Sequence, residues 1–343
     1  MMSRTSPCLG GVQLSPRRVT SLGPGLPGLV SIIIPTYRRV KEMREAALSA
    51  LAQTYPNVEV IVVADGPDPD ARAAVEGIDA RLRYFELEKN SGPAEARNRG
   101  VRMSRGEWLA FLDDDDLVLP ERVERCIAAA QADRPNVMIA CRTIYRRDGK
   151  QDDVWPQRPI GPDEDVSEYI LVRPSLLGRP GVIPVQALMV HRSIFEIVPF
   201  TTHRDHEDWA WLLEAWNIAG ARVEFVWEPL VIYNIVTESI SRSRRMNWRD
   251  SLHWANRYRK WLTPRAYNSF LATKVALKAK RAGELKGVAE IFMTIANNRP
   301  RPLDILFVAG VALLPNVLLQ AAWKRSLSSG ESHETPAEAS TPR

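Results

Sequence analysis

The chain has 343 residues, of which 45% are hydrophobic and 25% charged, and its formal net charge is +5. These values exclude an intrinsically disordered chain and are typical of a globular protein with one large or two modest domains. The three cysteines, Cys8, Cys126 and Cys141, form no CxxC pair. A disulfide framework is therefore not expected, and a reducing compartment fits the chain.

The first 28 residues are rich in Gly, Pro and Ser, so we predict a flexible leader over residues 1–28. Gly and Pro interrupt each of its apolar runs, which argues against a secretory signal. We therefore expect a cytoplasmic protein.

Strand and helix patterns alternate in the part of the chain that follows. Short apolar or β-branched runs predict strands over residues 30–34, 58–63, 82–87, 108–112 and 136–143. Helical patterns lie between them, over residues 41–53, 70–77, 93–104 and 120–132. This alternation predicts an α/β fold with a mostly parallel sheet flanked by helices, which binds its ligand at the carboxyl ends of the strands. Three loops would meet at those ends, at residues 35–38, 65–67 and 113–116.

The rest of the chain is less regular. Residues 151–184 are rich in Pro and Gly and predict loops, followed by a helix over 206–219 and a strand over 222–227. Residues 241–325 predict a basic helical region, because twelve Lys or Arg residues lie between positions 241 and 281 against a single acid, Asp250. We expect a disordered tail over residues 326–343.

The segment at residues 303–323 is mostly apolar and close to the length that spans a bilayer. Asp304, Pro315, Asn316 and Gln320 interrupt it. We therefore expect a helix pair that packs on the domain or lies at a membrane surface, with a true membrane span as the less favoured alternative.

Four consecutive carboxylates, Asp113 to Asp116, follow the strand at 108–112. They repel one another, so they must be exposed, neutralised or bound to a cation. Magnesium and manganese take oxygen ligands, usually one or two protein carboxylates together with substrate phosphates. A solvated acidic turn is the alternative, but the position directly after an apolar strand favours a divalent-cation site.

Two other groups of residues carry candidate chemistry. Arg97 lies inside a predicted helix, from which its guanidinium could fork onto a phosphate or a loop carbonyl, or remain a surface charge. Glu207 and Asp208 stand at a helix start, where an acid is more often a cap or a partner of the helix dipole. His203 and His206 have an HxxH spacing, but no third ligand supports a zinc site.

The ordered series VSIIIPTYRR, VEVIVVADGP, NSGPAEARNRG, WLAFLDDDD and HEDWAW resembles the family 2 glycosyltransferases over about residues 29–235. The resemblance implies a GT-A fold over residues 29–240, with a nucleotide-sugar donor lying across the strand ends. It also implies the residues on the nucleotide side of this site. Pro35, Thr36 and Tyr37 would border the base and ribose, Asp65 would contact the base and Arg97 would support the pocket.

The same resemblance assigns the family's DXD motif to Asp113, Asp114 and Asp115. Asp113 would approach the ribose, and Asp115 would bind the metal. Asp114 counts among the donor-binding residues through this motif, although it could also, like Asp116, only shape the turn. The family's ED pair falls on Glu207 and Asp208, with Asp208 as the general base.

The implied reaction is the inverting, metal-assisted transfer of a single sugar to a hydroxyl of a glycan or lipid-linked acceptor. A UDP-sugar is the favoured donor, with GDP- and dTDP-sugars as alternatives, and the cation would be magnesium or manganese. Ala64 stands where the family often has a second aspartate, which bears on the nucleotide preference. The QxxRW motif of processive synthases is missing, which argues for single additions rather than a long polymer.

Two other functions remain as alternatives. A nucleotidyltransferase would share the fold class and the metal carboxylates, but the loop after the first strand lacks the Gly-rich, Lys-containing sequence such enzymes usually need. A non-catalytic protein could use the basic region to bind a membrane or nucleic acid, but no nucleic-acid motif accompanies these charges. We therefore expect no nucleic-acid partner, and a peripheral position at the inner face of the cell membrane as a variant of the cytoplasmic location.

Overall fold

The computed structural model describes residues 22–23, 25–130, 136–147, 152–176, 178–201, 206–235 and 247–315. Most of the predicted leader, His203 and the predicted tail at 326–343 lie outside these ranges.

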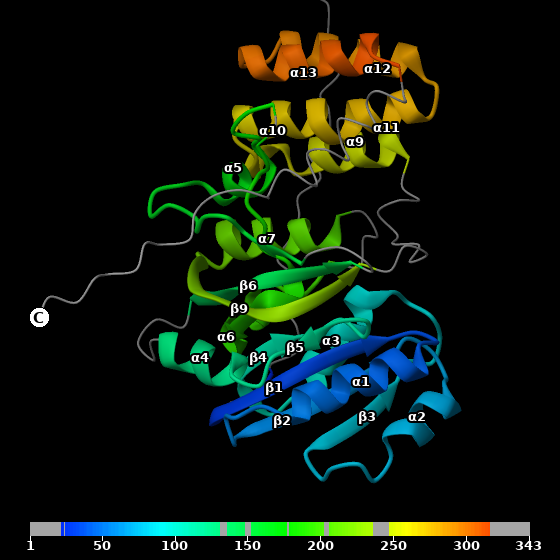
Figure 1. The fold of residues 1–343 in the computed structure, drawn as a ribbon, viewed down its shortest axis with the longest axis vertical. Helices are drawn as coiled ribbons and strands as arrows, with labels where there is room; N and C mark the ends of the chain where they lie inside the picture. The colour runs from blue at the N-terminus through cyan, green and yellow to red at the C-terminus, as the bar shows by residue number, and fades with distance from the viewer. Residues whose placement is uncertain are drawn as a thin grey trace, which may run out of the picture.

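A single curled sheet runs through the middle of the molecule, as Figure 1 shows. Its order within the described residues is β3-β2-β1-β4-β8-β6-β9-β5, with β7 paired to β6. The strands are β1 (Leu26–Thr36), β2 (Val58–Ala64), β3 (Leu82–Glu86), β4 (Gly106–Phe111), β5 (Leu117–Val118), β6 (Val137–Arg147), β7 (Asp153–Trp155), β8 (Leu188–His191) and β9 (Arg222–Ile235).

The sheet has a parallel part and a mixed part. Strands β3, β2, β1 and β4 are mutually parallel, which confirms the prediction for the first half of the chain. Strand β8 then runs antiparallel to both β4 and β6, and β5 runs antiparallel to β9. The short strands β5, β7 and β8 were not predicted, because segments of two to four residues show no usable alternation. The sheet is therefore more mixed than the sequence indicates.

Helices surround the sheet and form a separate stack at one end. Those around the sheet are α1 (Val40–Leu51), α2 (Pro69–Val75), α3 (Pro93–Met103), α4 (Arg122–Ala129), α5 (Val166–Leu171), α6 (Arg192–Ile197) and α7 (Glu207–Ile218). The stack consists of α9 (Trp248–Arg257), α10 (Pro264–Phe270), α11 (Ala276–Arg281), α12 (Leu285–Ala296) and α13 (Pro302–Leu313). Short helical turns lie at η1 (Val185–Ala187), η2 (Arg259–Trp261) and η3 (Leu271–Val275), of which η3 is a π-helix.

Successive side chains of β1 point to opposite faces of the sheet, so this strand separates two hydrophobic cores. Ile33 packs in the core that includes α3 and α7, whereas Ile32 and Ile34 pack in the core that includes α1. The buried residues of α1 are those of the predicted apolar stripe: Met43, Ala46, Ala47, Ala50 and Leu51.

Helix α3 lies very close to β1. A Cβ added at Gly100 would meet Cγ2 of Ile33 at 2.4 Å, so only glycine fits at this crossing. The close approach fixes the start of α3, and with it Arg97, against the carboxyl end of the strand.

Two predicted irregular segments contain regular structure. The predicted leader ends too late, because β1 already begins at Leu26, whose N–H donates to the carbonyl of Arg105 at 2.8 Å. Within the segment predicted as loops, β7 pairs with β6, and α5 begins after Asp165, whose carboxylate accepts the N–H of Ser167 at 2.8 Å. Both elements are short and lie between Pro and Gly residues, which hid them from the sequence pattern.

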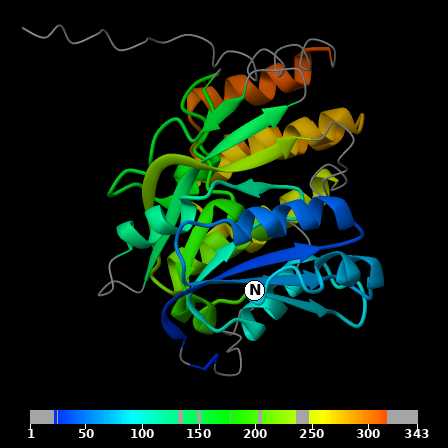
Figure 2. The same cartoon turned by 60° about the horizontal axis from the view of Figure 1, so that its bottom comes forward.

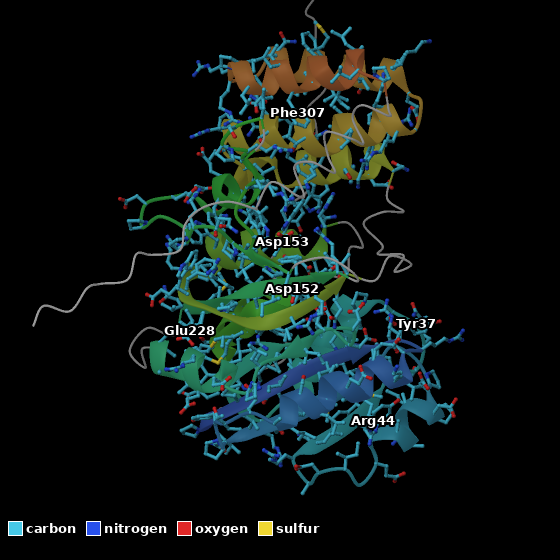
Figure 3. All side chains as sticks on the ribbon, viewed as in Figure 1. Tyr37, Arg44, Asp152, Asp153, Glu228 and Phe307 are labelled. Carbon is cyan, nitrogen blue, oxygen red and sulfur yellow. The ribbon has the colours of Figure 1, made fainter. Side chains whose placement is uncertain are left out.

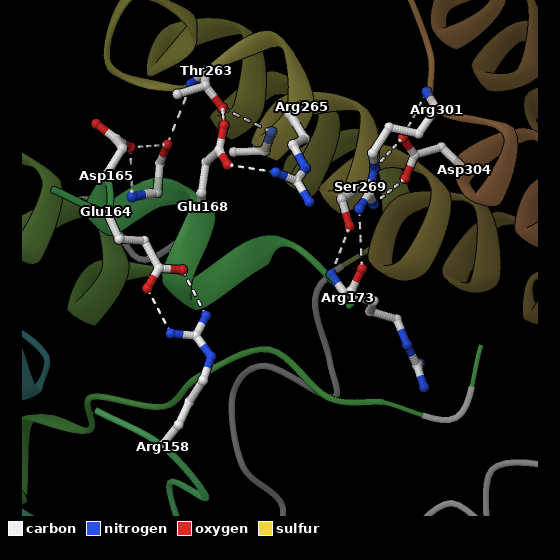
Figure 4. A network of polar contacts seen from close by, with 12 residues as sticks. Arg158, Glu164, Asp165, Glu168, Arg173, Thr263, Arg265, Ser269, Arg301 and Asp304 are labelled. Carbon is white, nitrogen blue, oxygen red and sulfur yellow. Dashed lines mark hydrogen bonds and ion pairs between the residues drawn. The ribbon is translucent and has the colours of Figure 1, made fainter. Parts of the chain in front are cut away.

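The C-terminal stack is attached to the sheet domain through α5 and the residues that follow it (Figure 4). The hydroxyl of Thr263 donates to Glu168 at 2.9 Å, and the N–H of Arg173 donates to the hydroxyl of Ser269 at 3.2 Å. Arg301 reaches back from the start of α13 and donates to the carbonyl of Arg173 at 3.1 Å. These contacts join α5 and the residues that follow it to α10 and to the start of α13 in one polar network.

The apolar segment predicted as a helix pair forms one helix, α13, within the described residues, and positions from 316 onward lie outside them. In the described part of the chain, no helix combines the length and the apolar character that a bilayer crossing requires. Both views place α12 and α13 at the end of the molecule opposite α2 and β3 (Figures 1 and 2).

Candidate active site

The candidate site lies where the parallel strands β1, β2 and β4 end. The N–H of Asp65, after β2, donates to the carbonyl of Thr36 at the end of β1 at 2.8 Å. The N–H of Leu112, after β4, donates to the carbonyl of Ile33 at 3.1 Å. The three loops predicted to meet at this edge are therefore in contact through the backbone of their strands.

Asp114 points into the protein and joins two of these loops. Its Oδ2 accepts the hydroxyl of Thr36 at 2.7 Å and the N–H of Tyr37 at 3.4 Å, and only 10% of its side chain is exposed. Burial raises the pKa of Asp114 to about 6, although the hydrogen bond from Thr36 and the charge of Arg39 oppose this rise. The geometry gives Asp114 the turn-shaping role; its predicted donor contact stays a prediction.

Arg39 bridges two consecutive carboxylates of the acidic loop, which consists of Asp113 to Asp116. Its Nη1 lies 3.1 Å from Oδ1 of Asp114 and 2.5 Å from Oδ2 of Asp115. Burial raises the pKa of the Asp115 carboxyl, although Arg39 opposes this rise. Sequence reasoning missed Arg39; its only local signal was a basic residue three positions after the end of a buried strand.

Asp116 is completely buried and is held by the end of β9. Its Oδ1 accepts the N–H of Asn234 at 3.1 Å, and the side chain of Asn234 donates to the carbonyl of Asp115 at 2.8 Å. Oδ2 of Asp116 has no hydrogen-bond partner within the described residues. Burial, and then the charges of Asp113 and Asp115, raise the pKa of Asp116 well above its usual range.

Arg97 connects the acidic loop to the carboxylate pair on α7. Its side chain is 4% exposed, with Nη2 2.7 Å from Asp113 and Nη1 3.2 Å from Glu207 and 3.4 Å from Asp208. Burial by itself would lower the pKa of Arg97, but the three carboxylates raise it, so the guanidinium stays charged. The alternative of a surface charge is wrong, because the side chain is buried, and the predicted fork onto a phosphate or a loop carbonyl stays a prediction. The supporting role beneath the pocket fits this position.

Asp208 is the more accessible member of the carboxylate pair. Its side chain is 44% exposed, against 18% for Glu207. Enclosure by the surrounding protein raises the pKa of Asp208, Arg97 opposes the rise and Asp113 adds to it. A carboxylate that is both reachable and made more basic suits a proton acceptor.

Asp65 is 3% exposed and holds the loop before α3. Its carboxylate accepts the N–H of Ser91 at 2.6 Å and that of Gly92 at 2.9 Å. Gly92 has a φ of 97°, a left-handed conformation that favours glycine. The structure thus gives Asp65 a loop-holding role, and its predicted contact with the base stays a prediction.

The predicted base-binding loop presents one exposed ring. Pro35 and Thr36 are buried, whereas Tyr37 is 46% exposed and lies at the edge of the domain in Figure 3. On the opposite strands, the rings of Tyr145 and Tyr233 lie 5.1 Å apart. Burial, and then the charge of Asp116, raise the pKa of Tyr233 to about 12.

The aromatic residues around the ED pair are mostly structural. Trp211 is fully buried and donates from Nε1 to the carbonyl of Val198 at 3.0 Å, so it belongs to the core. His206 stacks on Trp209 with ring centroids 5.1 Å apart, and its Nε2 lies 3.1 Å from the hydroxyl of Ser251. Burial, and then nearby lysines, lower the pKa of His206 to about 3, so the ring is neutral.

Among the described residues, no three His, Cys, Asp or Glu side chains are gathered as a metal-binding group. Asp113 and Asp115, the two aspartates predicted to contact the donor and the metal, have side chains that are 28% and 22% exposed. Magnesium commonly uses one or two carboxylates and takes its other oxygens from phosphates and water. The two exposed aspartates fit such a partial ligand set.

Solved structures establish the type of fold. TarS from S. aureus, in complex with UDP-GlcNAc, aligns over 89% of this chain and 93% of its own, with a TM-score of 0.56 and 16% identity. The mannosyltransferase PcManGT from Pyrobaculum calidifontis, in complex with GDP-Man and Mn²⁺, aligns over 92% of both chains, with a TM-score of 0.52 and 18% identity. At these identities the likeness establishes the fold, which is that of the GT-A glycosyltransferases.

The sequence comparison agrees with this fold. The model of glycosyl transferase family 2 matches residues 31–196 of this chain. The amylovoran biosynthesis glycosyltransferase AmsB of Erwinia amylovora is 27% identical over 292 residues, which cover 78% of this chain and 92% of AmsB. In several Rickettsia relatives the matching stretch covers only 16% or 17% of the relative. The predicted resemblance to this family and the predicted fold class are confirmed.

Proposed function

We propose that this protein is an inverting glycosyltransferase that moves one sugar from a nucleotide-diphosphate sugar to a hydroxyl of a glycan or lipid-linked acceptor. The observation that carries the proposal is the buried guanidinium of Arg97, which contacts Asp113 of the DXD motif at 2.7 Å and Asp208 of the ED pair at 3.4 Å. One side chain thus holds the acidic loop and the proposed base side by side.

The residues of the site have separate roles in this proposal. The exposed ring of Tyr37 borders the base, and Asp113 approaches the ribose from the end of β4. Asp115 is the proposed protein ligand of a magnesium or manganese ion, which would offset the charge that develops on the leaving diphosphate. The Mn²⁺ reported for PcManGT supports a divalent cation here.

Asp208 accepts the proton of the acceptor hydroxyl while the hydroxyl oxygen attacks the anomeric carbon. The bond from that carbon to the diphosphate oxygen breaks in the same displacement, so the nucleoside diphosphate leaves with the electron pair. A single displacement without an enzyme nucleophile inverts the anomeric configuration. Arg97 keeps Asp208 ionised and directed toward the acidic loop while the acceptor binds.

A UDP-sugar is the proposed donor, with GDP-sugars as the main alternative. UDP-GlcNAc and GDP-Man are the donors named for TarS and PcManGT, and both comparisons are at too low an identity to decide between them. The relation to AmsB, a protein of amylovoran biosynthesis, supports an acceptor in cell-envelope polysaccharide synthesis.

The test is a panel of UDP-, GDP- and dTDP-sugars with manganese, measured by direct binding and by slow donor hydrolysis. At least one nucleotide sugar should bind, and EDTA should weaken its binding. The proposal is lost if none of these donors binds to the folded protein. A transfer of a nucleotidyl group rather than of the sugar would favour the nucleotidyltransferase alternative.

We also propose that the cytoplasmic enzyme docks on an anionic membrane surface through α12 and α13. Four apolar side chains on these helices are more than half exposed: Leu285, Met293, Leu306 and Leu313. Arg281, the last residue of α11, and Lys286, in the first turn of α12, are exposed and could meet anionic headgroups. Such docking fits an acceptor carried on lipid.

A further inference from the structure

Two arginines neutralise the acidic loop, and they differ in how firmly they are held. Arg97 has three carboxylate partners and a side chain that is 4% exposed. Within the described residues, the ion pairs of Arg39 are with Asp114 and Asp115, and 38% of its side chain is exposed. Exposed ion pairs contribute little free energy, about 0.2–1 kcal/mol each, so the contacts of Arg39 can be exchanged at low cost.

Arg39 forms an ion pair with Asp115, the carboxylate that the proposed mechanism needs as a ligand of its cation. Its Nη1 lies 2.5 Å from Oδ2 of Asp115, within hydrogen-bonding distance of the oxygen. A guanidinium nitrogen and a divalent cation compete for the same carboxylate when both approach it. The donor-free protein therefore has a built-in cation at the position proposed for the metal.

The position of Arg39 allows it to move without disturbing the fold. It is the residue before α1 and makes no side-chain cap of that helix. Arg38, just before it, has a φ of 55° and is exposed. The hydrogen bonds of Arg39 to Asp114 and Asp115 come from Nη1, and the guanidinium carries further donors on Nε and Nη2.

We infer that Arg39 is a displaceable counter-ion: it holds Asp115 in the donor-free protein, yields this carboxylate to the divalent cation and then pairs with the diphosphate of the donor. The inference rests on the proposed function. Arginine suits the second step because its planar fork matches phosphate oxygens. The exchange keeps the local charge nearly balanced before and after the donor binds.

Removal of Arg39 should therefore have opposite effects on the two ligands. Without the competing guanidinium, Mn²⁺ should bind to the donor-free protein about fivefold more tightly, the scale of one partly exposed ion pair. UDP should bind about fivefold more weakly at saturating Mn²⁺, because one phosphate partner is lost. A residue with a purely structural role would change both affinities in the same direction.

The experiment compares wild type, Arg39→Ala, Arg39→Lys and Arg44→Ala. Free Mn²⁺ is followed by its electron paramagnetic resonance signal during titration without nucleotide, and UDP binding is followed by calorimetry at saturating Mn²⁺. Arg44, labelled in Figure 3, is a matched control, since it is an exposed arginine on α1. Arg44→Ala removes the same charge and should leave both affinities within twofold of wild type, and Arg39→Lys should restore UDP binding in part.

The inference is overturned if Arg39→Ala binds Mn²⁺ no more tightly than Arg44→Ala, or if its affinity for UDP is unchanged. Asp115→Asn in the Arg39→Ala background should abolish the gain in Mn²⁺ affinity, and a gain that persists would also overturn it. Wild-type protein that binds no nucleotide sugar at all would instead overturn the proposed function, which separates the two failures.

Discussion

Arg97 on α3 and Asp208 on α7 are 111 positions apart in the chain, yet Nη1 of Arg97 lies 3.4 Å from Oδ1 of Asp208. The same guanidinium contacts Asp113, so the acidic loop and the proposed base share one buried cation. The close packing of α3 on β1 at Gly100 fixes where this cation stands. The arrangement makes the site sensitive to a small number of substitutions.

The first prediction concerns Asp208. Asp208→Asn should leave donor binding within about twofold of wild type and lower transfer by a factor of about 10² to 10⁴, the range of a lost general base. The substitution keeps the side-chain shape, so the effect should fall on kcat. The measurement is sugar transfer beside donor binding by calorimetry. Undiminished transfer would remove Asp208 from the role of base.

The second prediction concerns Arg97. Arg97→Leu should destabilise the fold by about 3–5 kcal/mol, because it leaves carboxylates near one another without their buried partner. The free energy of unfolding in urea measures this effect. Arg102→Ala is the matched control, since Arg102 lies on the same helix, is 35% exposed and forms an ion pair with Glu95 at the surface. The control should cost no more than about 1 kcal/mol. Equal losses for the two variants would contradict a central role for Arg97.

The third prediction is a pH dependence of stability. The pKa of Asp114 rises from its usual value of 3.8 to about 6 in the folded protein, so folding favours the protonated form. The stability that this group contributes is fully present below its unfolded pKa and is lost as the pH rises through the folded pKa. A shift of about two pKa units corresponds to an upper bound of about 3 kcal/mol.

Asp114→Asn removes this titration and keeps an acceptor for the hydroxyl of Thr36. The variant should therefore gain stability relative to wild type as the pH rises from 4 to 7, and the gain should be smallest at pH 4. Urea denaturation at several pH values across this window measures it. A difference between the two proteins that does not change with pH would speak against the raised pKa of Asp114.

The fourth prediction concerns the exposed face of the C-terminal stack. Leu306 and Leu313 are 60% and 83% exposed on α13. Replacing both with Asp should abolish co-flotation with vesicles that contain phosphatidylglycerol and leave donor binding unchanged. Leu48→Asp on α1 is the control, because Leu48 is 38% exposed and belongs to the sheet domain. Docking through α13 is refuted if wild type does not float with these vesicles or if the double variant floats as wild type does.

The sequence by itself determined the parallel half of the fold. The buried face of α1 could be identified from the spacing of Met43, Ala46, Ala47, Ala50 and Leu51, because apolar residues on the buried face of a helix recur every three or four positions. The apolar run before Asp113 located the end of β4 in the same way. The ordered motifs then supplied the family resemblance, which the comparison over residues 31–196 confirmed.

Only the tertiary structure decided which charges meet. Asn234 supports Asp116 across 118 positions, and Arg39 reaches Asp115 across 76. Such contacts depend on how β9 pairs with β5 and on how the loop after β1 folds over the loop after β4. These contacts leave no periodic pattern in the sequence, since an ion pair or a hydrogen bond between distant segments constrains two positions and not their neighbours. The sequence could therefore identify the acidic run as a site, while the identity of its counter-ions had to come from the fold.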